Sequence, residues 1–272
     1  MKKLSFYEAR KLDSREIRKN IRKDIYTNHT SGLAVNKLQA NVVILPKTLA
    51  NEFHDFCLKN SKSCPLVGKT DVGDPIFKNL GDDIDIRYDV PSYNIYKNGE
   101  LNASVKNIQD YWRKDLVSFA IGCSFTFEYE LLKHNLSIDH VDNNKIVPMY
   151  KTNIKNNSSG VFNSNMVVSM RIFKKSDEKK IIDISKQFLF AHGEPIHIGE
   201  EKKIGIEKIL SPDWGDPPRL KQIDENYYFW ACGVTPQNAL MHAKIPFCIT
   251  HTPGHMLITD KFEKDISNLE DF

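Results

Sequence analysis

The sequence lacks any apolar run long enough to cross a bilayer, since the longest, such as residues 41–46, are far too short. It also lacks a strong charge of either sign: 38 Lys and Arg stand against 35 Asp and Glu, which gives a net charge of +3. Non-specific nucleic-acid binding usually shows as a strongly basic domain. We therefore expect neither a membrane nor a nucleic acid as a partner.

The five cysteines are an odd number without close, regular spacing, so they make a poor disulfide framework. No secretory apolar segment precedes residue 30. The start is basic, but four acidic residues interrupt it, whereas transit peptides are poor in acid: Glu8, Asp13, Glu16 and Asp24. We expect a reduced, soluble, cytoplasmic protein.

The composition that is present is that of a globular protein, with 40% hydrophobic and 27% charged residues over 272 positions. Residues 1–30 are predicted to be a basic, helical N-terminal extension. Ser5 and Glu8 have capping-box spacing, and Ile17, Ile21 and Ile25 recur every four residues. The remaining residues, 31–272, are predicted to form a single domain.

Strand-like and helix-like patterns alternate without a strict βαβ rhythm, which favours an α+β fold with mixed sheets and helices. The predicted helices are residues 48–60, 108–115 and 179–190. The predicted strands include residues 38–45, 84–87, 116–121, 147–154, 166–172, 227–231, 247–250 and 256–259. Asn98-Gly99 predicts a hairpin, because this pair supplies the positive φ angles of a tight turn.

The chain also repeats a pattern: residues 119–132 resemble residues 228–241, with Cys, Thr and Leu in the same places and Glu matched by Gln. Weaker echoes join 148–153 to 246–251 and 166–169 to 256–259. We interpret them as an internal duplication into halves of about 31–175 and 176–272. Chance matching of short apolar patterns is the alternative.

Each Cys-x-x-Thr turn of this repeat is predicted to lie between the end of a strand and the start of a helix. A helix N-terminus offers free N–H groups and the positive end of the helix dipole, which suit a carboxylate or an oxyanion. Two such turns facing each other would bind a small acidic metabolite. This is the partner that the sequence predicts, and a homo-oligomer stays open.

The first turn supplies three candidate catalytic residues, Cys123, Ser124 and Glu128. A thiol at a helix N-terminus has a lowered pKa, so Cys123 could act as a nucleophile. Ser124 could donate a hydrogen bond, and Glu128 could act as an acid or base. Alternatively, Cys123 is a small buried hydrophobe and Glu128 merely belongs to the first turn of a helix.

The second turn supplies candidate substrate-binding residues, Cys232, Gly233 and Thr235. Thr235 followed by proline is also the preferred start of a helix, so capping alone would explain it. Near the end of the chain, His251 and His255 could move protons, or they could simply stabilise a polar turn.

A zinc site built from the histidines and Asp260 is an open alternative, but Pro253-Gly254 separates His251 from His255 and prevents a helical arrangement of the pair. We predict no metal and no cofactor.

Three cationic residues could hold a substrate carboxylate: Arg87, Arg171 and, more weakly, Lys151. Each arginine ends a strand-like stretch, from which a guanidinium can bind a carboxylate through two hydrogen bonds. Each could equally pair with an acidic residue of the protein.

Taken together, these segments resemble the D-glutamate cyclase family, whose bacterial members are named hydro-lyases. The resemblance runs from about residue 39 to residue 260. It is carried by Gln39–Pro46, Cys64–Gly68, Asp83–Arg87, Gly122–Glu128, Val147–Asn153, Val167–Arg171, His192–Gly199, Pro212–Asp216, Phe229–Gln237 and Phe247–Asp260.

The activity that this resemblance implies is the reversible loss of water from D-glutamate, giving 5-oxo-D-proline. Two other functions stay open at this point. One is a non-catalytic sensor or carrier of a small acidic metabolite. The other is a hydro-lyase acting on a different small carboxylic acid.

Overall fold

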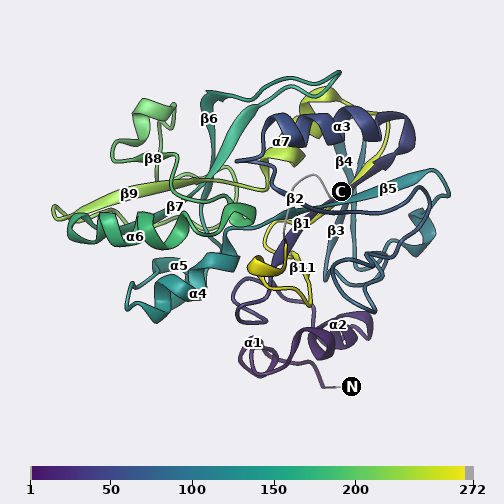
Figure 1. Cartoon of the computed structure of the whole chain (residues 1–272), viewed down its shortest axis with the longest axis horizontal. Helices are drawn as coiled ribbons and strands as arrows, with labels where there is room; N and C mark the ends of the chain where they lie inside the picture. Colours follow the sequence, from purple (N-terminus) through teal and green to yellow (C-terminus); the bar gives the residue numbers. More distant parts are fainter. Residues whose placement is uncertain (1, 267–272) are drawn as a thin grey trace.

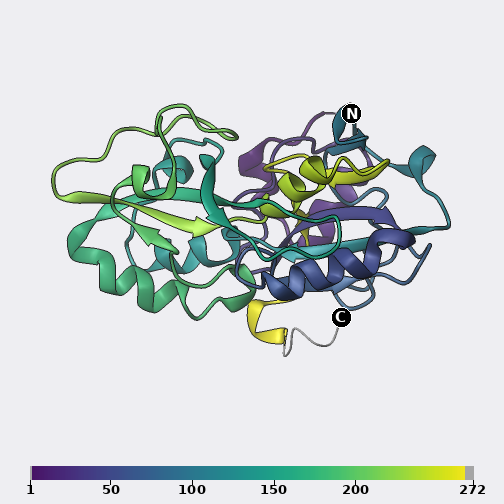
Figure 2. The same cartoon turned by 90° about the horizontal axis from the view of Figure 1, so that it is seen from above.

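The computed structural model describes residues 2–266, and these form two antiparallel sheets that lie side by side with helices packed on them (Figures 1 and 2). The predicted α+β class is confirmed. Every strand pairing among the described residues is antiparallel.

The first sheet has the strand order β2-β5-β1-β10-β3-β4, with β11 also paired to β1. Its strands are β1 (Gln39–Pro46), β2 (Leu66–Lys69), β3 (Tyr93–Lys97), β4 (Glu100–Val105), β5 (Leu116–Gly122), β10 (Cys248–His251) and β11 (Leu257–Ile258). The second sheet has the order β6-β7-β9-β8. Its strands are β6 (Met149–Lys155), β7 (Asn165–Lys174), β8 (His197–Ile198) and β9 (Glu225–Ala231).

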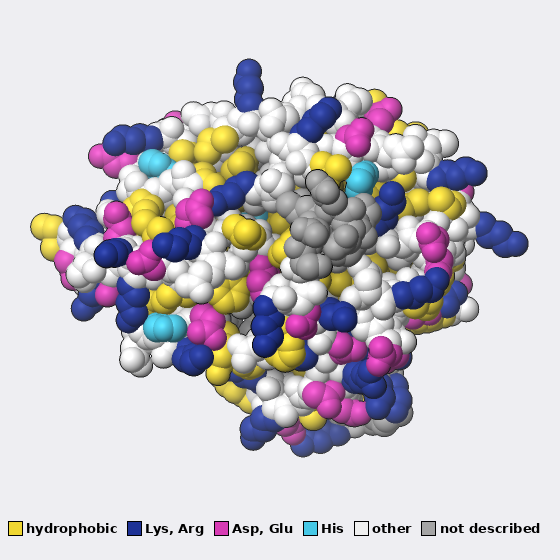
Figure 3. All heavy atoms as spheres, in the orientation of Figure 1, with side chains coloured by type: hydrophobic (Ala, Val, Ile, Leu, Met, Phe, Trp, Pro, Cys, Tyr) yellow, Lys and Arg dark blue, Asp and Glu magenta, His cyan; other side chains and the backbone are white. Residues whose placement is uncertain are grey.

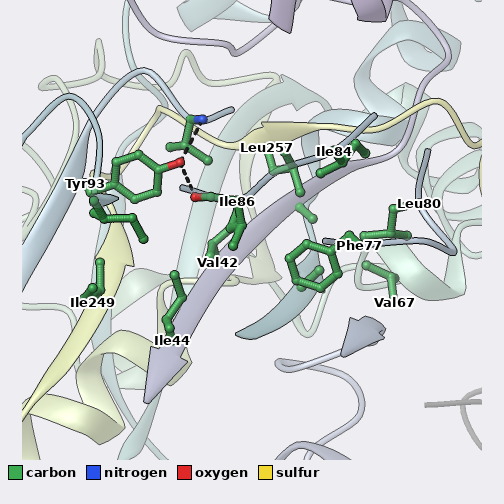
Figure 4. Packing of buried hydrophobic residues seen from close by; sticks show 14 of the residues in the cluster. Val42, Ile44, Val67, Phe77, Leu80, Ile84, Ile86, Tyr93, Ile249 and Leu257 are labelled. Atoms are coloured by element: carbon green, nitrogen blue, oxygen red, sulfur yellow. Dashed lines mark hydrogen bonds between the residues drawn. The ribbon is translucent and has the colours of Figure 1, made fainter. Parts of the chain in front are cut away.

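The central strand β1 is buried on both faces, as its continuous apolar run predicts. Val42 and Ile44 point into a core that the segment before β3 covers, where the Tyr93 hydroxyl donates to the Ile86 carbonyl at 2.6 Å (Figure 4). Val43 and Leu45 point the other way, toward the helices α3 (Lys47–Lys59) and α7 (Thr235–Ala243). The period of two along β1 thus builds two cores from one strand.

Two helices cross from one sheet to the other. Helix α4 (Phe125–Lys133) follows β5 of the first sheet, yet Phe127 and Leu131 pack on β9 of the second sheet. Helix α7 follows β9 of the second sheet, yet Ala239 and Leu240 pack in a core of the first. This exchange places both helix N-termini where the two sheets meet.

The remaining helices are α1 (Phe6–Ala9), α2 (Ser14–Arg22), α5 (Asp139–Asp142) and α6 (Glu178–Ser185). The 3₁₀ helices are η1 (Gln109–Tyr111), η2 (Lys175–Asp177), η3 (Leu189–Ala191), η4 (Glu201–Ile204) and η5 (Glu263–Asp265).

The sheets do not follow the predicted halves. Residues 39–122 and 248–258 build the first sheet, whereas residues 149–231 build the second. A boundary at about residue 175 falls between β7 and β9, which pair with each other. The first echo falls on two strand–helix units, β5–α4 and β9–α7, and the weaker echoes fall on pairs of strands, β6 with β10 and β7 with β11. The duplication stays a prediction.

Two predicted elements are wrong. Residues 84–87 form a turn, with a single β-bridge between Ile76 and Asp85. The reason is local, because the Asp85 N–H donates to Asp89 Oδ2 at 2.8 Å and is not available to a neighbouring strand. Residues 108–115 contain only η1, because Trp112 adopts an extended backbone and ends the helix there.

The N-terminal residues pack against the rest of the protein, and the predicted capping box is confirmed: the Glu8 N–H donates to Ser5 Oγ at 3.3 Å, and the Ser5 N–H donates to Glu8 Oε2 at 2.8 Å. Ile17 and Ile21 of α2 are buried against Ile258. The fully buried Arg18 donates to Asp260 Oδ2 at 2.8 Å and to Asp83 Oδ1 at 2.5 Å.

Acid is expected to weaken this docking. Burial raises the pKa of Asp260, but hydrogen bonds from Arg18 and Ser14 outweigh it and hold the net pKa below its usual range; Asp83 shifts the same way. A carboxyl whose folded-state pKa is depressed stabilises the protein above its unfolded pKa of about 4, and this stability is lost as the pH falls through the folded value. The melting temperature should therefore drop between about pH 5 and pH 2.5. Asp260→Asn, melted over the same range, should flatten the drop; an unchanged curve would contradict the assignment.

Basic and acidic side chains are interspersed over the face shown in Figure 3. Among residues 2–266, none of the helices combines the length and apolar character needed to cross a membrane.

Candidate active site

The two cysteine-bearing turns converge on one side chain, Asn41 of β1. Asn41 Nδ2 donates to the Gly122 carbonyl at 3.0 Å, just before Cys123. A Cβ atom on Gly233 would lie 2.0 Å from the same nitrogen, so the second turn also touches Asn41. Cys123 and Cys232 belong to one apolar cluster, together with Met256.

The two turns also make matching contacts to neighbouring strands. The Gln39 N–H donates to Thr126 Oγ1 at 3.3 Å, and the Val167 N–H donates to Thr235 Oγ1 at 3.0 Å. Thr126 thus fixes the start of α4 against β1 of the first sheet, and Thr235 fixes the start of α7 against β7 of the second sheet. Thr235 is fully buried, which gives it a structural role at this junction.

Neither thiol is activated. Burial raises the pKa of Cys123 to about 12 and that of Cys232 to about 11, although backbone hydrogen bonds from Phe125 and Val234 oppose the rise. The predicted lowering of the Cys123 pKa is therefore wrong, because burial outweighs the helix N-terminus. Both thiols are neutral at pH 7.

The charged centre of the site is Glu128, in the first turn of α4 and only 3% exposed. Its Oε1 accepts from Arg171 Nε at 2.8 Å and from Arg171 Nη2 at 2.5 Å, and it lies 3.0 Å from His140 Nε2. Arg171 also donates to Ser124 Oγ at 2.9 Å. The structure therefore joins three predicted residues, Ser124, Glu128 and Arg171, into one buried cluster.

Arg171 is held by packing as well as by charge. Its guanidinium carbon lies 5.3 Å from the Phe127 ring centroid and 5.2 Å from that of Trp230, and Nη1 donates to Ser169 Oγ at 2.9 Å. Because Nε, Nη1 and Nη2 of its guanidinium all donate to these protein groups, they are not free to bind a substrate carboxylate. Arg171 instead orients Glu128.

Glu128 keeps one unused oxygen. Burial raises the pKa of Glu128, but the charges of His140 and Arg171 and their hydrogen bonds outweigh it, so that the net pKa lies below its usual range. Glu128 is therefore ionised at pH 7. Its Oε2 is buried and has no hydrogen-bond partner among the described residues. A buried acceptor without a donor is costly and marks a place for a ligand or water.

Three hollows reach this cluster from different sides. One lies between α4 and residues 32–39 and is lined by Glu128. A second is lined by His29 and His140, and a third by His140 and Arg171. The buried charge of the cluster thus lies beside small hollows on several sides.

The predicted histidines occupy two environments. His251 is buried in β10, where its Nδ1 accepts the Val42 N–H at 3.1 Å, and burial lowers its pKa to about 4. His255 Nδ1 lies 3.2 Å from the Pro253 carbonyl. Burial lowers the His255 pKa, and the nearby charge of His29, which lines the second hollow, lowers it further. His255 therefore lies near His29, whereas His251 is a neutral core residue, and neither contacts Glu128 or Arg171 among the described hydrogen bonds and ion pairs.

Two predicted cations do not join the cluster. Arg87 binds Asp85 through two hydrogen bonds, at 2.9 and 2.6 Å, so the alternative of an internal partner is the correct one for it. The side chain of Lys151 is 55% exposed, and its Nζ lies 3.6 Å from Asp213 Oδ1 and 5.3 Å from the Trp214 ring centroid. Neither residue contacts Glu128 or Arg171 among the described hydrogen bonds and ion pairs.

Sequence reasoning missed His140, Asn41 and Gln39. His140 lies on a four-residue helix without a motif, and nothing in the sequence marks it. Asn41 is the one polar side chain inside the apolar run 40–45, a signal that could have been used. Within residues 2–266, no group of three or more His, Cys, Asp or Glu side chains is arranged to hold a metal ion.

Comparisons with known proteins give one family and many close relatives. A family model described as D-glutamate cyclase matches residues 117–260. A protein named "putative hydro-lyase" from Pelagibacter ubique is 47% identical over 254 residues, which cover 93% of this chain and 97% of that protein. A protein of the same name from Dinoroseobacter shibae is also 47% identical, over 90% of this chain and 81% of its own length.

Among solved structures, a nitrogen repressor-like protein from Methanococcus jannaschii aligns with 95% of this chain and 99% of that chain. The identity is 11% and the TM-score is 0.41, which is too low to support a conclusion.

Proposed function

The chain belongs to the D-glutamate cyclase family, as its motifs predicted, and we propose that it catalyses the reversible dehydration of D-glutamate to 5-oxo-D-proline. In this reaction the amine nitrogen attacks the γ-carboxyl carbon, a C–N bond forms and a C–O bond breaks. The ammonium gives up two protons, and the departing oxygen leaves with both as water. The enzyme must therefore move protons from nitrogen to oxygen.

The observation that carries this proposal is the buried, ionised Glu128 with a free Oε2 beside a hollow. A carboxylate there can accept a proton from the substrate ammonium, because both lie in a site of low dielectric where the proton transfer needs no solvent. His140, 3.0 Å from the other oxygen, can take part in the transfer to the departing oxygen. Arg171 and Ser124 orient Glu128.

We assign the developing oxyanion to the backbone of the two converging turns. The backbone N–H groups of Ser124 and Gly233 donate no hydrogen bond to another of the described residues. Preorganised N–H groups at helix starts stabilise such charge. Both cysteines then serve as neutral packing at these turns, and no covalent thioester is required.

Glu128→Gln is expected to reduce 5-oxoproline formation from D-glutamate by about 100-fold or more, because the amide keeps the size of the side chain but cannot accept the proton. Turnover is measured by the appearance of 5-oxoproline. The matched control is Glu130→Gln, which changes a half-buried glutamate on the same helix that contacts Lys133 at the surface, and it should keep activity.

Circular dichroism of both variants shows whether they fold. Full turnover in a folded Glu128→Gln would remove the assigned proton transfer. Tight binding of D-glutamate without turnover in the wild type would instead favour a carrier.

A further inference from the structure

Two buried acceptors without a donor belong to side chains that line the hollow between α4 and residues 32–39. One is Glu128 Oε2. The other is Oε1 of Gln39, a side chain that is 2% exposed and also lines this hollow. They come from different elements, α4 and β1, and line the same hollow.

The orientation of the Gln39 amide is fixed by its other end. Gln39 Nε2 donates to the Leu33 carbonyl at 2.9 Å. A carbonyl can only accept, so the amide nitrogen must face Leu33, and the amide oxygen is the atom left without a donor. Two side chains that line the hollow thus each keep an acceptor without a donor, one of them charged, which suits a group with several N–H donors.

A cationic side chain, that of Arg10, also lines this hollow. Arg10, just after α1, lines it and is exposed, and its guanidinium has no hydrogen bond or ion pair among the described residues. The other lining cation, Lys37, is occupied, because its Nζ donates to the Asp260 carbonyl at 2.8 Å. Arg10 is thus the group available to a carboxylate.

We propose that this hollow is an α-amino-acid subsite, in which Glu128 and Gln39 accept hydrogen bonds from the substrate ammonium and Arg10 binds the adjacent carboxylate. The proposal rests on the proposed function only in taking the ligand as glutamate. It replaces Arg87 and Arg171 as carboxylate ligands by a residue of the N-terminal segment. Gln39 and Arg10 both lie outside residues 117–260, the range that the family model matches.

The test compares D-glutamate with D-2-hydroxyglutarate, which has a hydroxyl in place of the ammonium, by calorimetric titration of the full chain. Gln39→Met should weaken D-glutamate by about 10-fold and the hydroxy acid by less than about twofold, because the ammonium donates to both Glu128 and Gln39, whereas the single proton of the hydroxyl goes to the charged Glu128. Arg10→Gln should weaken both ligands alike, by about 10-fold, because both carry the carboxylate. Lys11→Gln, an exposed neighbour outside the hollow, is the matched control.

The outcomes separate the subsite from the activity. Wild-type affinity for D-glutamate in both Gln39→Met and Arg10→Gln overturns the subsite, even if 5-oxoproline is formed. The expected pattern of affinities supports the subsite, even if the wild type forms no 5-oxoproline and the proposed activity fails. Should Gln39→Met not fold, Arg10→Gln decides alone, since Arg10 is at the surface.

Discussion

Arg171→Met is expected to destabilise the protein by about 3–5 kcal/mol and to abolish turnover. The substitution leaves the charge of Glu128 buried without its guanidinium partner, and breaking a buried ion pair from one side costs this much. It also removes the group that Ser124 and Ser169 accept from. Urea unfolding at pH 7, followed by circular dichroism, measures the loss.

The chain offers a matched control in Arg87→Met. Arg87 also binds a carboxylate through two hydrogen bonds, but its side chain is 31% exposed, and such pairs contribute only about 0–1 kcal/mol. The double variant Glu128→Gln, Arg171→Met should recover much of the stability without activity, because neither charge of this pair then remains without its partner. A loss of less than about 1 kcal/mol in Arg171→Met would contradict the buried pair.

The loss in Arg171→Met should also depend on pH. With the guanidinium gone, only His140 opposes the effect of burial, and the pKa of Glu128 should rise above its value in the wild type. A carboxyl with a raised folded-state pKa is destabilising at high pH, and this cost disappears as the pH falls and the group is protonated. The variant should therefore lie closest to the wild type in mild acid.

Local patterns predicted much of the fold. The apolar run of β1 and the strand–turn–helix pattern around Cys123 are local, since strand and turn depend on neighbouring residues. Residues 84–87 alternate like a strand, but the Asp85 N–H donates to the side chain of Asp89 and not to a neighbouring strand. The alternation of residue types does not reveal this competing hydrogen bond.

The candidate site was predictable only in parts. Glu128 and Arg171 were each named, but their pairing depends on α4 crossing from the first sheet to the second, which no local pattern contains. The Cys123 pKa went the opposite way because burial, set by the whole packing, outweighs the helix end. Arg10 was assigned to an extension because nothing in the sequence shows that α1 packs beside α4.

The contact of both turns with Asn41 makes a second large effect testable. Gly233→Ala is expected to destabilise the protein by about 2–3 kcal/mol, because the new Cβ would lie 2.0 Å from Asn41 Nδ2 in a closely packed junction. Asn41 must then give up its bonds to the Ile121 and Gly122 carbonyls. Urea unfolding measures the change, and 5-oxoproline formation should fall with it, since the turn carries the proposed oxyanion amide.

At the first turn, the atom that a new Cβ would meet is a backbone atom and not a side-chain atom, and this difference supplies the control. A Cβ on Gly122 would lie 1.6 Å from the Phe190 carbonyl oxygen, which belongs to the backbone and cannot be removed by substitution. Asn41→Ala should therefore offset much of the loss in Gly233→Ala but none of the loss in Gly122→Ala. A double-mutant cycle gives the coupling in each case. If Asn41→Ala relieves both variants equally, or neither, then the two turns do not meet at Asn41 in the way that the catalytic proposal needs.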